Sequence, residues 1–351
     1  MRTGAAVAWS SLVLIGCASG PVGRPQPSAA AARPPGRFEF TQPQMGVPFR
    51  MVFYAPDAPT ASNAAQAAFA RVAALNRVMS DYEDDSELTQ LSRTAGSGRA
   101  VPVSEDLWRV LARAQRLAGR SEGAFDVTVG PAVQLWRRAR RQQEMPDPAR
   151  LQQMLRAVGH RKLVLDPRQR TATLTVPGMR LDLGGIAKGY AVDEALKTLR
   201  TWGITRALVS GGGDLAVGDP PPGAKGWRIE IAPLDATNAP PQRHLLLKRC
   251  ALATSGDLFQ HVELNGRRYS HIVDPRTGVG LTDHSLVTVL ASDCTTADSL
   301  STVVSVLGPS AGLKLIEATP KAAAHVVRKP AEQIEVFESK RFRRFVEAPQ
   351  P

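Results

Sequence analysis

The sequence is poor in cysteine, in aromatic residues and in long apolar runs. Its 351 residues include three cysteines and 5% aromatic residues. It contains no Cys-x-x-Cys pair and no His/Cys cluster, which argues against a structural zinc site. Beyond the N-terminus, no segment approaches the length of a transmembrane helix. Hydrophobic and charged contents of 43% and 22% are those of a globular protein with a substantial core.

Acidic residues are outnumbered by basic ones, and the net charge is +12. A strongly basic balance is typical of nucleic-acid binding. Here the cations are spread along the chain, and the densest cluster, at residues 137–141, has no interleaved aromatic residues. A basic surface that faces an anionic membrane or phosphorylated ligands explains the charge as well, so no nucleic-acid partner is expected.

The N-terminus resembles a targeting segment. Arg2 precedes a short apolar stretch at residues 4–16, and the order Leu-Ile-Gly-Cys at residues 14–17 is typical of a lipobox. We predict a lipoprotein signal peptide over residues 1–17, with the lipids on Cys17. A plain signal peptide with a chance cysteine is the alternative.

The segment after Cys17 is rich in Pro, Ala and Gly, so we predict a tether over residues 18–37. The folded domain is expected over residues 38–345, followed by a tail at 346–351. These features predict a membrane-anchored lipoprotein facing the bacterial periplasm. Ala18 after the cysteine favours the outer membrane, but the choice between the inner and outer membrane stays open.

Apolar periodicity predicts an α+β fold, with a mostly antiparallel sheet and helices packed on it. Helices are expected over 60–79, from Ser104, from an Asp147 cap to a Gly159 stop, over 190–200, and over 295–308 before Pro309. Strands are expected at 48–54, 163–165, 172–176, 206–210, 227–231, 244–254 and 286–290. Cys250 and Cys294 lie in strand-like surroundings; two buried thiols are the simpler expectation, and a disulfide stays open.

A carboxylate and a hydroxyl lie one helical turn apart at Asp298 and Thr302. Side chains at this spacing project from the same helix face. Mg²⁺ prefers oxygen ligands and retains some water, so this pair with a backbone carbonyl suits it. The alternative is a helix-capping Asp and a buried Thr.

Two glycine-rich turns are candidates for phosphate binding. Residues 183–189, LGGIAKG, open a predicted helix, where backbone N–H groups are able to approach oxyanions. This segment matches neither the dinucleotide fingerprint nor the Walker loop, and glycine turns are usually only turns. SGGGD at 210–214 is a second permissive site of the same kind.

Two further loops carry polar or aromatic groups. In HIVDPRTG, at 271–278, His271 is a candidate acid or base because the unperturbed pKa of a histidine lies near neutrality, although a structural histidine is an equal alternative. In GAFDVTVGP, at 123–131, the Phe125 ring suits contact with a planar ligand. The alternative is a core Phe beside a turn-forming Asp126.

Eight motifs occur in a fixed order between Met45 and Gly308. They are MG at 45–46, SDYEDDSEL at 80–88, GAFDVTVGP at 123–131, LDLGGIAKGYAVD at 181–193, SGGGD at 210–214, ATSGD at 253–257, SHIVDPRTG at 270–278 and ADSLST at 297–302. This ordered set resembles the ApbE-like FAD:protein FMN transferases, a flavin transferase family formerly labelled thiamine-biosynthesis lipoproteins. The resemblance implies an ApbE-like, T-fold-like architecture.

The resemblance also implies a reaction. Family members cleave FAD at its pyrophosphate with Mg²⁺ and join FMN by a phosphoester to a Thr or Ser of an acceptor flavoprotein, while AMP leaves. The expected acceptor is an NqrC- or RnfG-like redox subunit or another protein with an FMN-binding domain. The alternatives are an FAD pyrophosphatase that releases FMN and AMP, and a non-catalytic FAD-binding lipoprotein.

The site residues carried over from the family fall into three groups. The implied Mg²⁺ ligands are Asp298, Thr302 and the backbone carbonyl of Gly185. His271 is expected to assist deprotonation of the acceptor hydroxyl, beside Asp274 and the catalytic Asp298. The implied FAD contacts are Met45, Tyr82, Ala124, Phe125, Asp126, Asp182, Lys188 and Ile272. Two departures are Ser301, where some relatives have an additional acid, and Ser92, where relatives often have Asn.

Overall fold

The structure is a computed structural model that describes residues 34–234, 243–257, 260–330 and 333–346. The described residues from Pro35 onwards belong to one compact unit. The predicted signal peptide, Cys17 and most of the predicted tether lie outside the described residues, as does the tail after Val346. The tether was predicted to reach Arg37, but Gly36 and Arg37 already belong to the first strand.

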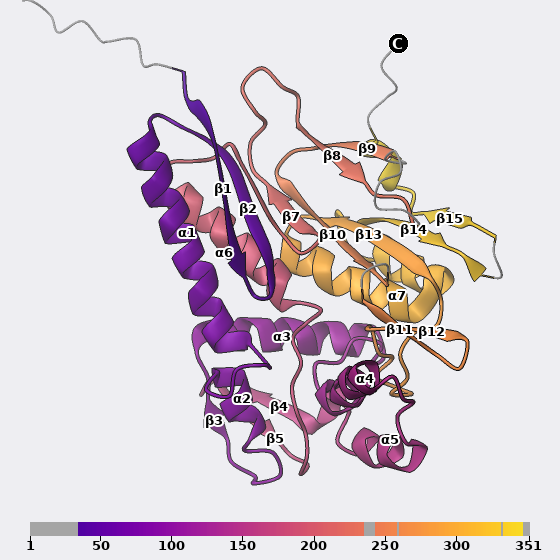
Figure 1. Ribbon diagram of the computed structural model, residues 1–351. Coiled ribbons are helices and arrows are strands. Elements are labelled where there is room, and N and C mark those ends of the chain that lie inside the picture. Colours follow the sequence, from indigo (N-terminus) through magenta and orange to yellow (C-terminus); the bar gives the residue numbers. More distant parts are fainter. Residues whose placement is uncertain (1–33, 235–242, 258–259, 331–332, 347–351) are drawn as a thin grey trace, which may run out of the picture. The chain divides into compact units, whose positions relative to one another are not determined.

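An eight-stranded antiparallel sheet forms the centre of this unit (Figure 1), in the order β1-β2-β6-β7-β10-β13-β14-β15. Every neighbouring pair in it is antiparallel. The strands are β1 (Gly36–Gln44), β2 (Val47–Ala55), β6 (Ala207–Gly211), β7 (Asp214–Val217), β10 (Cys250–Gly256), β13 (Ser285–Ala291), β14 (Ala323–Arg328) and β15 (Glu335–Glu338). The predicted α+β class with a mostly antiparallel sheet is therefore confirmed.

Three long helices cover one face of the sheet: α1 (Ala58–Met79), α6 (Ala187–Thr201) and α7 (Cys294–Glu317). Alternate residues of a strand point to opposite faces, and β2 shows this directly. Met51 and Phe53 pack under the helices, whereas Val52 packs on the other face. A ribbon of β8 (Trp227–Ile231) and β9 (Arg243–Leu247) covers that second face.

The remaining elements lie mostly at one end of the helical layer (Figure 1). The helices there are α2 (Glu87–Ser92), α3 (Glu105–Arg120), α4 (Gly130–Gln142) and α5 (Pro148–Leu155). A small sheet is built from β3 (Val101–Pro102), β4 (Leu163–Asp166) and β5 (Thr171–Leu174), and β11 (His261–Leu264) pairs with β12 (Arg267–Ser270). Short 3-10 turns occur at His160–Lys162 and Phe342–Arg344.

One predicted helix end needs correction, and at a second the helix breaks where it was predicted to stop. The helix capped by Asp147 ends at Leu155 rather than near Gly159, because the chain turns immediately after its second turn and Gly159 takes a φ of 144°. The helix over 295–308 breaks at Gly308, where φ is 73° and ψ is 173°. A new helical segment then begins at Pro309, which fits the first position of a helix.

Several elements were not predicted: α2, α4, β1, β3, β7, β11, β12, β14 and β15. Two of them show why. Helix α4 has a buried stripe of Ala132, Leu135, Trp136 and Ala139 at helical spacing, but the arginines between these residues obscured the pattern. Strand β1 is a largely exposed edge strand, and its sequence follows directly on the Pro/Ala-rich segment. Both cysteines are free, with Cys294 buried and Cys250 half-buried, so the open disulfide is not formed.

Helix α7 is long and apolar enough to cross a membrane by length and composition alone, and no other helix among the described residues is. Half of that apolar window is buried within the protein. Its residues Ala297, Leu300 and Val304 belong to the main core. Packing against the sheet therefore accounts for its hydropathy.

Candidate functional site

The site is built where α6 crosses α7 with no space between their backbones. A Cβ atom at Gly189 would lie 2.4 Å from the Cys294 carbonyl oxygen and 2.8 Å from the Asp298 Cβ. The amide of Gly189 donates a hydrogen bond of 2.9 Å to the Asp298 carboxylate. Only glycine permits this approach, and it fixes the Asp298 side chain against the start of α6.

The three groups predicted to hold Mg²⁺ come together at this crossing. A Cβ atom at Gly185 would lie 2.9 Å from Thr302 Oγ1, so the glycine turn touches the second predicted ligand of α7. Thr302 Oγ1 lies 3.3 Å from the Asp298 carbonyl oxygen. Among the described residues, no hydrogen bond reaches the Gly185 carbonyl. A carboxylate, a hydroxyl and an unengaged carbonyl are the kinds of oxygen that Mg²⁺ accepts.

Two buried carboxylates share one lysine beside these groups. Lys188 Nζ lies 2.8 Å from Asp214 Oδ2 and 3.8 Å from Asp298 Oδ1. Burial raises the pKa of Asp298, and Lys188 opposes this effect. Burial also raises the pKa of Asp214, and the nearby charge of Asp298 raises it further. Burial alone would lower the pKa of Lys188, but the two carboxylates hold it above its usual value.

The charge balance of this trio suits a cation. When both carboxylates are ionised, the trio carries a formal charge of −1 in a place with little water, and a cation would stabilise that form. No group of three His, Cys, Asp or Glu side chains suited to a metal occurs in the part of the chain that the structure describes. The residues therefore fit a sparsely ligated ion such as Mg²⁺, which retains waters or phosphate oxygens, better than a fully caged metal.

A second group of predicted residues is organised by an arginine of α4. The Arg137 guanidinium lies 4.3 Å from the centre of the Tyr82 ring. It also donates to Asp182 Oδ2 at 2.9 Å and to the Asp81 carboxylate. Tyr82 is 76% exposed, so its other face is open to a ligand. Burial, then the neighbouring Asp81, raises the pKa of Asp182, and Arg137 opposes this.

The GAFDVTVGP loop lies against the glycine turn. A Cβ atom at Gly185 would lie 3.3 Å from the Phe125 ring, which is itself buried. Ala124 is also buried. The Asp126 carboxylate accepts hydrogen bonds of 2.8 and 2.7 Å from the amide and hydroxyl of Thr128, so it closes its own loop. Contact of these three residues with FAD stays a prediction.

The turn between β1 and β2 reaches the same region. Met45 adopts a φ of 50° in this turn and is half-buried. Two residues on, the Val47 side chain lies 3.2 Å from the Cβ position of Gly212, and the Lys188 stem lies 3.4 Å from it. Gly212 of the SGGGD turn therefore contacts both the β1–β2 turn and the Lys188 side chain.

His271 lies at the surface with one ring nitrogen engaged. Its Nδ1 lies 3.0 Å from the Gln260 carbonyl oxygen, which only accepts, so Nδ1 carries the proton and Nε2 keeps its lone pair. Protein atoms around the ring displace water and lower the pKa of His271 below its usual value, and the Lys188 charge lowers it further. Ile272, the next residue, is half-buried, and its amide donates to Ser270 Oγ at 3.1 Å.

Two contacts hold the loop that carries His271. The Asp274 carboxylate accepts hydrogen bonds from the amide and the guanidinium of Arg276. Trp136 of α4 donates from Nε1 to the Gly278 carbonyl oxygen at 2.7 Å. Helix α4 thus contacts the histidine loop through Trp136 and the Tyr82–Asp182 group through Arg137.

Both departures from the family pattern have structural partners. Ser301 is fully buried and its hydroxyl bonds the Asp298 carbonyl at 2.8 Å and Ser255 Oγ at 2.7 Å, which links α7 to β10. Ser92 Oγ accepts a hydrogen bond of 3.2 Å from the Leu181 amide, at the start of the LDLGG segment. The hydroxyl groups of both serines are therefore hydrogen-bonded.

Comparison with known proteins agrees with this geometry. The family model described as ApbE family matches residues 45–326, which contain all the predicted site residues. The chain belongs to the ApbE family. A Haemophilus influenzae protein named FAD:protein FMN transferase is 35% identical to this ApbE family member over 260 residues, or 72% of this chain and 75% of that protein. A Vibrio cholerae protein of the same name is 31% identical over 304 residues, or 86% and 90% of the two chains.

Solved structures agree at the level of the fold. The flavin transferase ApbE from Vibrio cholerae matches with a TM-score of 0.78 at 30% sequence identity, covering 89% of this chain and 100% of that one. The flavinyl transferase ApbE from Pseudomonas stutzeri matches with a TM-score of 0.79 at 28% identity, covering 90% and 99%. The predicted ApbE-like architecture is therefore confirmed.

Sequence reasoning missed several residues of this ApbE family member's site. Asp214 ends the SGGGD motif, but the motif alone indicates no role for it. Asp193 ends the GYAVD motif, and its carboxylate accepts hydrogen bonds of 2.8 and 2.9 Å from the amides of Cys294 and Thr295, which caps α7. In the sequence, Arg137 stands out only as part of a basic cluster. The first two were signalled by their place inside named motifs.

Proposed function

We propose that this protein is a Mg²⁺-dependent FAD:protein FMN transferase. It cleaves FAD at the pyrophosphate, attaches FMN through a phosphoester to a Thr or Ser of an acceptor flavoprotein, and releases AMP. The observation that carries the proposal is the meeting of Gly185, Lys188, Asp298 and Thr302 at one helix crossing. That crossing lies inside a chain whose relatives are named for this activity.

In this proposal, the oxygen groups at the helix crossing bind the metal ion. Asp298, Thr302 and the Gly185 carbonyl would hold Mg²⁺, which supplies Lewis-acid neutralisation of the charge that develops on the diphosphate. Lys188 adds a fixed positive charge beside them. Its link to Asp214 keeps the ammonium in place and protonated. Phosphoryl transfer depends mainly on such positioning and charge neutralisation.

His271 is the proposed base for the acceptor hydroxyl. Its Nε2 carries the lone pair because Nδ1 is engaged with the Gln260 carbonyl. Its lowered pKa keeps the ring neutral at pH 7, which is the form that takes up a proton. The surface position of His271 leaves it accessible to a hydroxyl on another protein. Asp274 keeps the loop in shape through Arg276.

The remaining predicted residues would bind FAD itself. Tyr82 offers an exposed aromatic face, supported from behind by Arg137. Asp182 is fixed by the same arginine and by the Gly184 amide at 2.8 Å. The other proposed contacts are Met45, Ala124, Phe125, Asp126, Lys188 and Ile272.

The proposed setting is the periplasmic side of a bacterial membrane. Lipidation of Cys17 and a tether from residue 18 would hold the domain near membrane-bound redox subunits of the NqrC or RnfG kind. These are suitable partners because the reaction needs an exposed Thr or Ser on a flavoprotein. Which membrane holds the anchor is left open by the sequence.

The test is the product itself. The full chain is incubated with FAD, Mg²⁺ and an acceptor subunit, and the acceptor is weighed by intact-protein mass spectrometry. We expect a gain of one FMN on the acceptor, abolished by a chelator and by Asp298→Ala. Free FMN and AMP without protein-bound FMN would assign the chain as an FAD pyrophosphatase. Bound FAD with no AMP release would make it a non-catalytic flavin carrier.

A further inference from the structure

A cavity of about 570 Å³ lies between α3, α6 and the start of α7, and none of its lining residues was predicted to bind FAD or Mg²⁺. Its volume falls in the range of small-molecule sites. Its cations come from three places: Arg109, Arg113 and Arg116 on α3, Lys197 and Arg200 on α6, and Arg249 before β10. We call this cavity the arginine groove.

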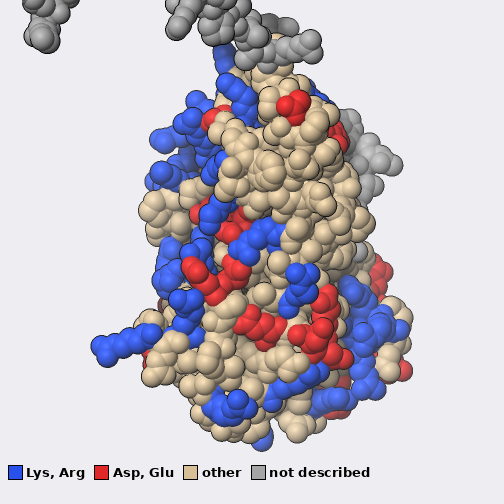
Figure 2. All heavy atoms as spheres, turned by 90° about the vertical axis from the view of Figure 1, so that its left-hand side faces the viewer, with Lys and Arg blue, Asp and Glu red and all other residues tan. Residues whose placement is uncertain are grey.

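The spacing of these residues explains why they gather. Arg109, Arg113 and Arg116 follow one another at four and three residues, which places them on one face of α3. Lys197 and Arg200 have the same relation on α6. Each helix therefore turns a cationic stripe toward the groove. On the face shown in Figure 2, basic side chains are dense along the left margin, and others lie among the acidic ones near its middle and at the lower right.

Most of these cations already have a carboxylate partner. Arg113 pairs with Asp293 at 2.6 Å, Lys197 with Glu194 at 3.4 Å, and Arg249 with Asp219 at 2.5 Å. Arg109 pairs with Glu105.

Arg116 and Arg200 differ from the others. Neither forms an ion pair with any residue that the structure describes, although both line the groove. They come from the two different helices, and the Asp193 carboxylate, which also lines the groove, is occupied by the α7 amides. Both side chains are exposed, so their guanidinium groups are accessible to an anion that enters the groove.

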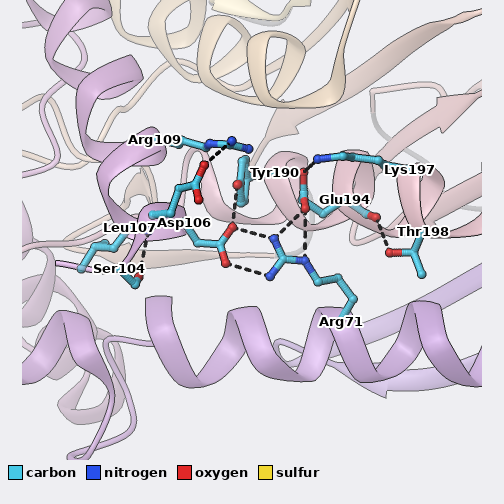
Figure 3. A network of polar contacts seen from close by, with 10 residues as sticks. Arg71, Ser104, Asp106, Leu107, Arg109, Tyr190, Glu194, Lys197 and Thr198 are labelled. Carbon is cyan, nitrogen blue, oxygen red and sulfur yellow. Dashed lines mark hydrogen bonds and ion pairs between the residues drawn. The ribbon is translucent and has the colours of Figure 1, made fainter. Parts of the chain in front are cut away.

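One end of the groove is rigid. Figure 3 shows Arg109 and Lys197 on either side of Tyr190, with the Arg71 guanidinium below them. Arg71 donates to Asp106 at 2.7 and 2.6 Å and to Glu194 at 2.6 Å, while the Tyr190 hydroxyl donates to Asp106 at 2.7 Å. These bonds join α1, α3 and α6, so the walls of the groove are fixed before any ligand arrives.

We propose that the arginine groove binds a small phosphorylated ligand. Guanidinium groups match phosphate oxygens with paired N–H donors, and two of them from separate helices suit a chain of phosphates better than a single anion. Trp108, Leu196 and Val217 give the groove an apolar part that suits a planar base. The shared chemistry is a polyphosphate group, carried either by a nucleotide or by inorganic polyphosphate.

The test measures binding to the full chain without divalent cations, by isothermal titration calorimetry with ATP, inorganic tripolyphosphate and adenosine. We expect ATP to bind, and Arg116→Glu/Arg200→Glu to weaken it by roughly tenfold or more, because attraction to phosphate becomes repulsion. Tripolyphosphate binding as tightly as ATP would assign the phosphates alone. Tighter binding of ATP would assign a nucleotide.

The matched control is Arg99→Glu/Arg161→Glu, which makes the same charge change at two exposed arginines outside the groove. It should bind ATP as the parent does. The proposal is overturned if the parent binds neither ATP nor tripolyphosphate, if the groove variant binds as tightly as the parent, or if the control loses as much affinity. Arg116→Gln/Arg200→Gln, with a melting curve, gives the same comparison if charge reversal impairs folding.

Discussion

Helix α6 takes part in two clusters that contain the same kinds of charged group but differ in how fully the carboxylates are hydrogen-bonded. In the candidate site, Lys188 lies between Asp214 and Asp298. Near the middle of the helix, Arg71 of α1 lies between Asp106 and Glu194 (Figure 3). Each cluster contains two carboxylates and one cation, so the difference between them comes from geometry and burial.

In the Arg71 cluster, hydrogen bonds within the cluster satisfy both carboxylates. Its guanidinium makes four hydrogen bonds to the two carboxylates, and their side chains keep 12–21% of their surface in contact with water. Arg71 accordingly lowers the pKa of Asp106.

In the Lys188 cluster, the single cation does not satisfy both carboxylates by hydrogen bonds. Lysine makes one hydrogen bond, to Asp214, and both carboxylates are 3–4% exposed, so burial raises the pKa of each. A structural network satisfies its carboxylates with hydrogen bonds from within, whereas this site leaves two buried carboxylates with raised pKa values, and a bound cation would stabilise their ionised form.

The largest expected effect comes from Asp298→Ala. We expect turnover with FAD and an acceptor to fall by roughly 10²–10³-fold, because the charge that develops on the diphosphate loses its metal-holding carboxylate. FAD affinity should fall far less, since the ring contacts remain. Steady-state kinetics and a fluorescence titration of FAD measure the two quantities, and equal losses in both would show that this division is wrong.

Glu194→Ala is the matched control for that experiment. It removes a carboxylate from the other cluster on α6 without touching the crossing with α7. Stability should fall while turnover stays within about threefold of the parent, because Glu194 contacts neither proposed substrate. A loss of turnover comparable with that of Asp298→Ala would mean that both clusters act in catalysis.

His271→Gln should lower turnover by about 10²-fold, the usual contribution of a positioned base. In the parent, kcat/KM should fall only when the pH drops below the ordinary histidine value of 6.5, because the pKa of His271 is lowered and the neutral ring persists there. A pH series from 5 to 8 measures this acid limb.

His244→Gln is the control, since this histidine contacts Glu230 on the covering ribbon, away from the site. The acid limb should vanish from His271→Gln and persist in His244→Gln. An unchanged profile in both variants would remove His271 from the proton transfer.

The close approach of the two helices is tested by Gly189→Ala. The added methyl group meets the Cys294 carbonyl and Asp298, so α6 and α7 must move apart at an estimated cost of about 1–3 kcal/mol. Gly119→Ala in α3 is the control, because no atom lies within 4 Å of its Cβ position, and a helical alanine is favoured by up to about 1 kcal/mol. Chemical denaturation should therefore shift the two variants in opposite directions, and a stable Gly189→Ala would contradict the crossing.

The same contrast explains what the sequence could predict. Local signals found α1, α3 and α5 by their caps and stripes, and they found the break of α7 at Gly308. Strand β1 was not predicted because an exposed edge strand has a weak apolar pattern. The end of α5 was placed too late because a glycine after a helix marks a turn without fixing where the helix stops.

In the candidate site, motifs identified residues but not their pairings. Asp298 and Thr302 are one turn apart, so their shared face followed from spacing alone. Lys188 and Asp214 are separated by 26 residues, and Arg137 and Asp182 by 45. Which carboxylate meets which cation depends on how helices pack on the sheet, and no local rule contains that information.

The smallest expected effect comes from breaking the completed cluster with Arg71→Met. We expect a loss of about 1–2 kcal/mol in the free energy of unfolding at pH 7, between the values for exposed and buried ion pairs. Because Arg71 lowers the pKa of Asp106 below 3.8, this contribution is fully present above that pH and is lost as the pH falls through the folded-state pKa. The free energies of unfolding of parent and variant, measured by urea denaturation, should therefore converge in acid.

The control is Arg37→Met, which removes an exposed pair with Glu39 and should change stability by less than about 0.5 kcal/mol at either pH. A difference between parent and Arg71→Met that persists at low pH would mean that Arg71 stabilises the helices by packing rather than by charge.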